Sequence, residues 1–93
     1  MQLPNGTPQG LRHILIVAWY VRNGGLTRTQ ATQTVAKEHG VFPQTVLDKY
    51  GRQLQLTTNQ FDRMLEEKDC LQLRKLLKER FPEYAEVVDG FLS

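Results

Sequence analysis

The residues best suited to chemistry at a surface are the polar side chains of segment 44–55. Val46, Leu47 and Tyr50 recur at the spacing of one helical face. The opposite face then carries amide, hydroxyl, carboxylate, ammonium and guanidinium groups: Gln44, Thr45, Asp48, Lys49 and Arg52. Arginine and lysine can donate to guanine, glutamine can pair with adenine, and threonine can contact a thymine methyl or a phosphate. This combination suits the major groove of duplex DNA.

Other residue types that support catalysis or metal binding lack a suitable arrangement. His13, His39 and Cys70 are widely separated and lack ligand spacing. Ser93 is the only serine, and the glycine pair at 24–25 is not followed by the Lys-Ser/Thr of a phosphate loop. The acidic residues form no paired-carboxylate constellation. We therefore expect no enzyme, no metal and no cofactor, with His39 satisfying carbonyls at the end of its helix and Cys70 packing in the core.

Size and composition predict one domain over residues 1–93. The chain has 93 residues, of which 40% are hydrophobic, so a single core is feasible without disulfides. Its one cysteine favours a reducing compartment. The longest apolar run, residues 14–21, is much shorter than the roughly 20 residues of a membrane span, and no cleavage site follows it. We expect a soluble, cytoplasmic protein without a membrane partner.

Charge is distributed unevenly along the chain. The formal net charge is only +2, but residues 1–56 carry six Lys and Arg against two Asp and Glu. Residues 57–93 carry six Lys and Arg against eight Asp and Glu. The first part would attract a polyanion and the second would not.

Helical periodicity and capping signals predict an all-α fold, a compact domain of five to six helices. The expected helices cover about residues 8–22, 27–39, 43–54, 57–66, 69–80 and 82–92. Thr7 followed by proline reads as a helix N-cap, and capping-box spacing occurs at 27/30, 57/60 and 69/72. Glycines 24, 25 and 40 lie at expected helix ends.

Residues 32–50 contain a further pattern. Two short helices that cross steeply need a small residue at their contact, a glycine at the turn, and apolar residues below the turn and inside the second helix. Ala36, Gly40, Val41 and Val46 fall at these places. The stretch Val35-Ala36-x-x-x-Gly40-Val41-x-Pro43-x-Thr45-Val46 resembles the core signature of the helix-turn-helix superfamily of DNA-binding domains. The resemblance covers about a quarter of the chain, and Phe42 departs from it, since the family usually has serine or another capping residue there.

The resemblance implies a helix-turn-helix at about 27–55, and the capping and periodicity signals predict C-terminal helices over 57–92. It implies that Gln44, Thr45 and Asp48 lie near the bases, with Lys49 and Arg52 at bases or phosphates. The first helix of the motif would flank the DNA backbone through Gln33 and Lys37, and Arg28 near its N-terminus would add a phosphate contact. Asp48 would repel phosphates but could accept from a cytosine amino group.

Two classes of function follow from these patterns. The leading one is double-stranded DNA binding, as a small transcription regulator or as the DNA-reading module of a larger protein. The alternative is a helical protein-interaction or oligomerisation module, because residues 71–92 are rich in apolar side chains. Those side chains either complete the core or form a homodimer or partner surface, and a dimer would place two recognition helices about one DNA turn apart.

Overall fold

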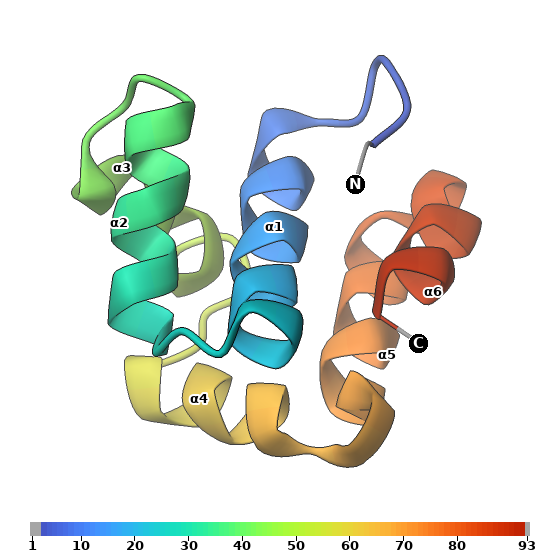
Figure 1. Ribbon diagram of the computed structural model, residues 1–93. Coiled ribbons are helices and arrows are strands. Elements are labelled where there is room, and N and C mark those ends of the chain that lie inside the picture. Colours follow the sequence, from blue (N-terminus) through green and yellow to red (C-terminus); the bar gives the residue numbers. More distant parts are fainter. Residues whose placement is uncertain (1–2, 93) are drawn as a thin grey trace.

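The computed structural model describes residues 3–92, and over this range the protein is all-helical, as predicted (Figure 1). Six α-helices follow in order: α1 (Gln9–Gly24), α2 (Arg28–Glu38), α3 (Pro43–Gly51), α4 (Thr58–Glu66), α5 (Leu71–Arg80) and α6 (Ala85–Leu92). Short 3₁₀ segments, Lys68–Cys70 and Pro82–Tyr84, precede the last two helices.

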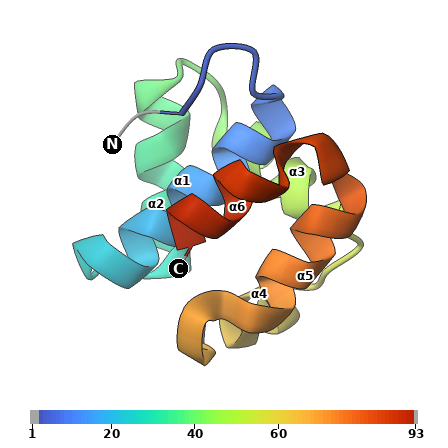
Figure 2. The same ribbon diagram turned by 90° about the vertical axis from the view of Figure 1, so that its right-hand side faces the viewer.

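Helix α1 lies at the centre of the molecule (Figure 1). It packs against α2 and α3 on one side and α6 on the other, and α4 runs beneath it towards α5. Viewed from the side, α6 crosses in front of α1 (Figure 2). Because α1 has neighbours around it, its side chains Leu11, Ile14, Leu15, Val17 and Ala18 are all fully buried. This explains why its sequence is apolar on nearly every face.

The core joins both sides of α1 in one continuous cluster. On the α2–α3 side, Tyr50 stacks on Phe61 with ring centroids 4.2 Å apart. On the other side, Leu73 and Leu77 of α5 and Val88 of α6 are fully buried. The C-terminal helices therefore complete the core, which was one of the two expectations for their apolar residues.

Two of the three predicted capping boxes are present. Thr27 Oγ1 accepts from the Gln30 amide at 3.1 Å while Gln30 Oε1 accepts from the Thr27 amide at 3.0 Å. The box at 57/60 has the same form. The box predicted at 69/72 is wrong, because Asp69 and Cys70 both adopt left-handed backbone angles at the bend between α4 and α5. Glu67 instead accepts from the amide of Gln72 at 2.9 Å.

Three other predicted boundaries need correction. Thr7 does not cap α1, because its hydroxyl donates to the carbonyl of Pro4 at 2.7 Å and residue 8 is the N-cap. Helix α3 ends at Gly51 rather than at 54, and the left-handed Gln55 (φ 56°) redirects the chain while Leu54 stays buried. The last helix starts as a 3₁₀ turn over 82–84 before it becomes α-helical.

Candidate functional site

Helices α2 and α3 are joined by a tight turn over residues 39–42 (Figure 1). Gly40 has φ +66°, a left-handed conformation that glycine adopts without steric cost. The Gly40 amide donates to the carbonyl of Lys37 at 3.3 Å, and the Val41 amide donates to the carbonyl of Ala36 at 2.9 Å. The side chain of Ala36 is 2% exposed, and Val41 packs against the core. The glycine, the small residue and the apolar residue therefore have the local roles expected from the sequence.

The inner face of α3 fixes this helix to the rest of the protein. Val46 and Tyr50 are buried, and the Tyr50 hydroxyl lies 3.2 Å from Thr32 Oγ1 of α2. The stack of Tyr50 on Phe61 adds a contact to α4. Helix α3 is thus held by three other helices, α1, α2 and α4.

The outer face of α3 carries a row formed by Gln44, Asp48 and Arg52, each one helical turn from the next. Gln44 Nε2 donates to Asp48 Oδ1 at 2.9 Å, and Arg52 Nε lies 3.8 Å from the same oxygen. Gln44 is exposed, and the Arg52 side chain is 83% exposed. Asp48 therefore holds a glutamine and an arginine side by side at the surface, and its charge is partly balanced by Arg52.

The other residues predicted to contact DNA from α2 and α3 differ in how exposed they are. Thr45 and Lys49 are half-buried, so each presents only part of its side chain to solvent. Gln33 and Lys37 on α2 are exposed, as expected for groups that would flank a nucleic-acid backbone.

Arg28 lies differently from the other predicted site residues. Its Nε donates to Asp62 Oδ1 of α4 at 2.8 Å, and its Nη1 donates to the Tyr50 hydroxyl at 3.4 Å. Burial lowers the pKa of Arg28, but the hydrogen bonds to Tyr50 and Asp62 outweigh this effect and the pKa is raised overall. The side chain is 17% exposed. Its guanidinium is used to join α2, α3 and α4, so the structure does not bring it together with Lys37 and Arg52 as a free cation.

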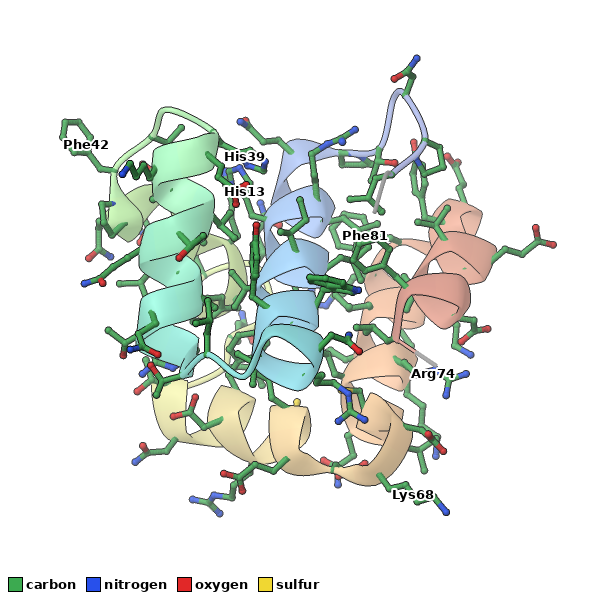
Figure 3. The ribbon with its side chains drawn as sticks, in the orientation of Figure 1. His13, His39, Phe42, Lys68, Arg74 and Phe81 are labelled. Carbon is green, nitrogen blue, oxygen red and sulfur yellow. The ribbon has the colours of Figure 1, made fainter. Side chains whose placement is uncertain are left out.

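A histidine pair lies beside the turn and was not predicted from the sequence. The rings of His13 and His39 stack with centroids 4.9 Å apart, where α2 ends against α1 (Figure 3). His13 is fully buried and neither ring nitrogen has a hydrogen-bond partner. Burial is the main cause that lowers its pKa to about 4, with contributions from His39, Lys49 and Arg12. Both histidines are visible in the sequence, but they lie on different helices and no local pattern connects them.

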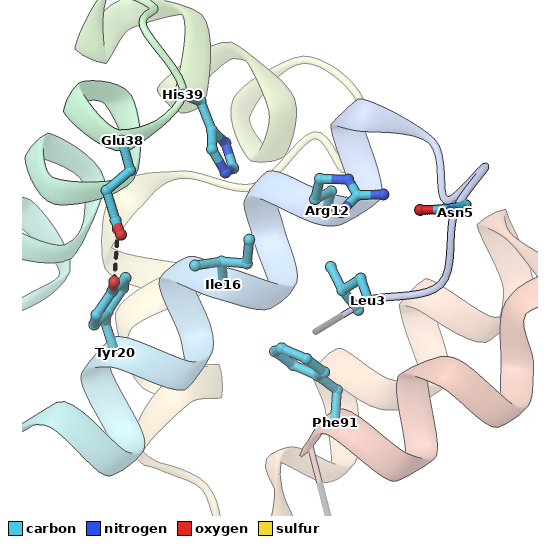
Figure 4. Close-up of a pocket in the computed structure, with 8 residues that line it drawn as sticks. All are labelled: Leu3, Asn5, Arg12, Ile16, Tyr20, Glu38, His39 and Phe91. Carbon is cyan, nitrogen blue, oxygen red and sulfur yellow. Dashed lines mark hydrogen bonds between the residues drawn. The ribbon is translucent and has the colours of Figure 1, made fainter. Parts of the chain in front are cut away.

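A cavity of about 400 Å³ opens between residues 3–5, α1, the end of α2 and α6 (Figure 4). It is lined by Leu3, Asn5, Arg12, Ile16, Tyr20, Glu38, His39 and Phe91. The Tyr20 hydroxyl donates to Glu38 Oε1 at 2.6 Å, and this bond raises the pKa of Tyr20. Arg12 donates to the carbonyl of Pro4 at 3.2 Å. Three of the polar side chains that line the cavity are therefore already engaged in hydrogen bonds within the protein.

Two cations of α5 pair with an acidic residue of α6. Arg74 Nη2 lies 2.9 Å from Asp89 Oδ1, and Lys78 Nζ lies 3.1 Å from the same oxygen. These two cations lower the pKa of Asp89. Cys70 is fully buried, and burial raises the pKa of its thiol, which agrees with a packing role.

Comparison of the chain with protein-family models, curated proteins and solved structures finds no match. Within residues 3–92, no group of three or more His, Cys, Asp or Glu is arranged to hold a metal ion. None of the helices in that range combines the length and apolarity that a bilayer crossing requires. The arrangement with the clearest chemical capacity is the solvent-facing side of α2 and α3.

Proposed function

We propose that this protein binds double-stranded DNA by placing α3 in the major groove, with α2 beside the phosphate backbone. The observation that carries the proposal is the division of α3 into two faces. Val46 and Tyr50 anchor one face in the core, and the Gln44–Asp48–Arg52 row occupies the other. An α-helix fits the major groove, and amide and guanidinium groups are the side chains that read base edges there.

The residues of the proposed interface have different roles. Gln44 and Thr45, in the first turn of α3, would contact bases, and Arg52 would reach a base or a phosphate. Asp48 is a positioning residue, because it accepts from Gln44 and neighbours Arg52. It also gives the interface an acceptor for a cytosine amino group. The protein would act as a small regulator or as the DNA-reading part of a larger protein.

The cations of this face set the expected strength of binding. Its positive residues are Lys37, Lys49 and Arg52. Among residues 3–92, Arg52 pairs only with Asp48 of α3, and Lys37 and Lys49 form no salt bridge. If each contacts one phosphate, log K should fall with log salt concentration with a slope of about −3, roughly −0.9 for each phosphate. A single copy would therefore bind DNA with modest affinity.

The direct test compares two double variants with the same change in charge. Fluorescence anisotropy with a labelled random-sequence duplex, at low and moderate salt, measures affinity for the wild type, Lys37→Ala/Arg52→Ala and Lys75→Ala/Arg80→Ala. Lys75 and Arg80 are exposed on α5, away from the proposed interface. We expect the first variant to bind at least tenfold more weakly with a smaller salt slope, and the second to bind like the wild type. Absent binding, or equal losses in the two variants, would contradict the proposal.

The alternative function, a protein-interaction module built on the C-terminal helices, has less support. Leu73, Leu77, Val88 and Leu92 are buried in the core of this molecule. Among the large hydrophobic side chains over 71–92, Leu71 alone is exposed, at 49%. Self-association through these helices stays a prediction that sedimentation velocity over a range of protein concentrations tests.

A further inference from the structure

We infer that Phe42 contacts the 5-methyl group of a thymine in the major groove and so makes the protein select thymine at one position of its DNA site. The inference rests on the proposed function and names one element of its sequence preference. It starts from an exposed aromatic ring at the first turn of α3, where the polar residues of the interface begin (Figure 3).

The exposure of Phe42 is exceptional in this protein. Its side chain is 81% exposed, and Leu71 is the only other large hydrophobic residue that is exposed within the described range 3–92. Phe61 is fully buried, and Phe81 and Phe91 are half-buried against the core. The protein thus has a place for its other three phenylalanines but directs this one into solvent.

The backbone that carries Phe42 is firmly held. Its carbonyl accepts from the amide of Thr45 at 2.9 Å, and the preceding residue, Val41, donates to the carbonyl of Ala36 at 2.9 Å. Pro43 follows directly and fixes its own φ near the helical value. The backbone position of Phe42 is therefore set by the same turn that orients α3.

Phenylalanine is an unfavourable choice for stability at this position. Phe42 is the N-cap of α3, and it makes no side-chain cap hydrogen bond. Thr27 and Thr57 do make such bonds at the starts of α2 and α4. Because the ring stays largely in water after folding, it also contributes little hydrophobic stabilisation. Local choices that oppose stability without a compensating contact are typical of functional positions.

The surroundings of the ring favour DNA over a protein partner. Two polar side chains close to Phe42 in the chain are exposed: Lys37 near the end of α2 and Gln44 in the first turn of α3. The anchor residue of a protein interface is usually enclosed by a broad apolar surface. Over the described residues, Phe42 is the only exposed large hydrophobic side chain in α2, α3 or the turn between them, where its apolar chain neighbours are exposed Pro43 and half-buried Val41. A thymine methyl, by contrast, is an isolated apolar group among hydrogen-bonding base edges and phosphates, and phenylalanine is among the side chains that contact it.

The test removes only the methyl group. Rounds of selection with the wild-type protein yield a preferred duplex, and each thymine is then replaced in turn by uracil, which pairs identically but lacks the 5-methyl group. We expect about a fourfold loss of wild-type affinity at one position, the effect of removing one buried methyl group from an apolar contact. Phe42→Ala should show no loss at that position, and Phe42→Leu should retain part of it. Leu71→Ala is the matched control at the other exposed hydrophobic residue and should keep the wild-type pattern.

The outcomes separate this inference from the proposed function. If selection yields no duplex that binds with a salt-dependent affinity, both the proposed function and the role of Phe42 are rejected. If a duplex binds but no uracil substitution weakens it, the role of Phe42 is rejected and DNA binding stands. The role of Phe42 is also rejected, and DNA binding also stands, if uracil at the sensitive position weakens the binding of Phe42→Ala as much as that of the wild type.

Discussion

The α2–α3 pair and the α5–α6 pair lie on opposite sides of α1, and they treat their charged side chains differently (Figure 1). On the α5–α6 side, Arg74 and Lys78 converge on Asp89, so two helices are joined by one carboxylate. On the α2–α3 side, Lys37 and Arg52 extend into solvent. Arg74 and Lys78 therefore join two helices, whereas Arg52 contacts only Asp48 one turn away and Lys37 is in none of the salt bridges of residues 3–92. Lys37 and Arg52 stay accessible to a partner, as do the exposed Lys75 and Arg80 of α5.

The same contrast appears within the α2–α3 side. Arg28 was predicted to contact phosphate, but it is bound to Asp62 and Tyr50 and so resembles Arg74 and Lys78 of α5. A cation that pairs with an acidic residue of another helix therefore serves the fold, even where its position in the motif predicts a contact with phosphate.

The largest expected effect tests whether the two sides form one cooperative unit. Tyr50→Ala should lower the free energy of unfolding by about 3 to 5 kcal/mol, because it removes a buried ring and leaves Thr32 and Arg28 without their shared partner. Leu77→Ala on α5 should cost about 2 to 5 kcal/mol. Urea unfolding followed by far-ultraviolet circular dichroism and by Trp19 fluorescence should give coincident transitions in both variants. Separate transitions would show that the two sides unfold independently.

The next largest effect is a pH dependence of the free energy of unfolding that arises from His13 and not from the α5–α6 side. Since the pKa of His13 falls from 6.5 to about 4 on folding, the unfolded chain binds a proton more readily than the folded one between these values. Stability should therefore be complete above pH 6.5 and fall by about 3 kcal/mol as the pH decreases to 4. Urea unfolding at several pH values measures the change, and His13→Leu should remove the loss of stability between pH 6.5 and 4.

Asp89 provides the comparison for acid sensitivity on the α5–α6 side. Lys78 and Arg74 lower the pKa of Asp89 below its ordinary value of 3.8. Its contribution to stability is present above that value and is lost as the pH falls through the lowered pKa. Asp89→Asn should therefore alter the pH profile only below about pH 4, while His13→Leu alters it above. A profile that His13→Leu leaves unchanged between pH 4 and 6.5 would contradict the role assigned to burial of that ring.

A third prediction compares the loss of a paired cation of α2, Arg28, with the loss of an unpaired one, Lys37. Arg28→Ala should destabilise the protein by about 1 kcal/mol, because it breaks a partly exposed ion pair and a hydrogen bond to Tyr50. Lys37→Ala should change stability by less than about 0.5 kcal/mol. In DNA titrations the order reverses: Lys37→Ala should reduce the salt slope by about 0.9, and Arg28→Ala should leave it unchanged. A reduced slope for Arg28→Ala would mean that its guanidinium leaves Asp62 to bind phosphate.

The helices were predictable from the sequence wherever a local signal determines them. The capping boxes at Thr27 and Thr57 and the turn at Gly40 each depend on residues within a few positions of one another, and all three are present. The local pattern misled at Asp69, because the bend between α4 and α5 places that residue in a left-handed conformation and brings Glu67 to the start of α5.

The arrangement of the site was only partly predictable. Helical spacing placed Gln44 and Arg52 on the solvent side of α3, and both are exposed. The pairing of Arg28 with Asp62 and the stacking of His13 on His39 join residues on different helices, so they depend on how the helices pack. The exposure of Phe42 depends on the direction of the chain at the turn between α2 and α3. The sequence showed only that Phe42 is an unusual residue for a cap, not where its ring lies.

The smallest expected effect concerns the start of α3. Replacing Phe42 by serine supplies the cap that Thr27 and Thr57 provide elsewhere, and it gives up little burial because the ring is already exposed. Phe42→Ser should therefore raise the free energy of unfolding by about 0.5 to 1 kcal/mol, whereas Thr57→Ala should lower it by about 1 kcal/mol. Urea unfolding of both variants at pH 7 measures the two changes. A destabilised Phe42→Ser would show that the ring supports the turn. A stabilised variant with weaker DNA binding would show that Phe42 lowers stability and strengthens recognition.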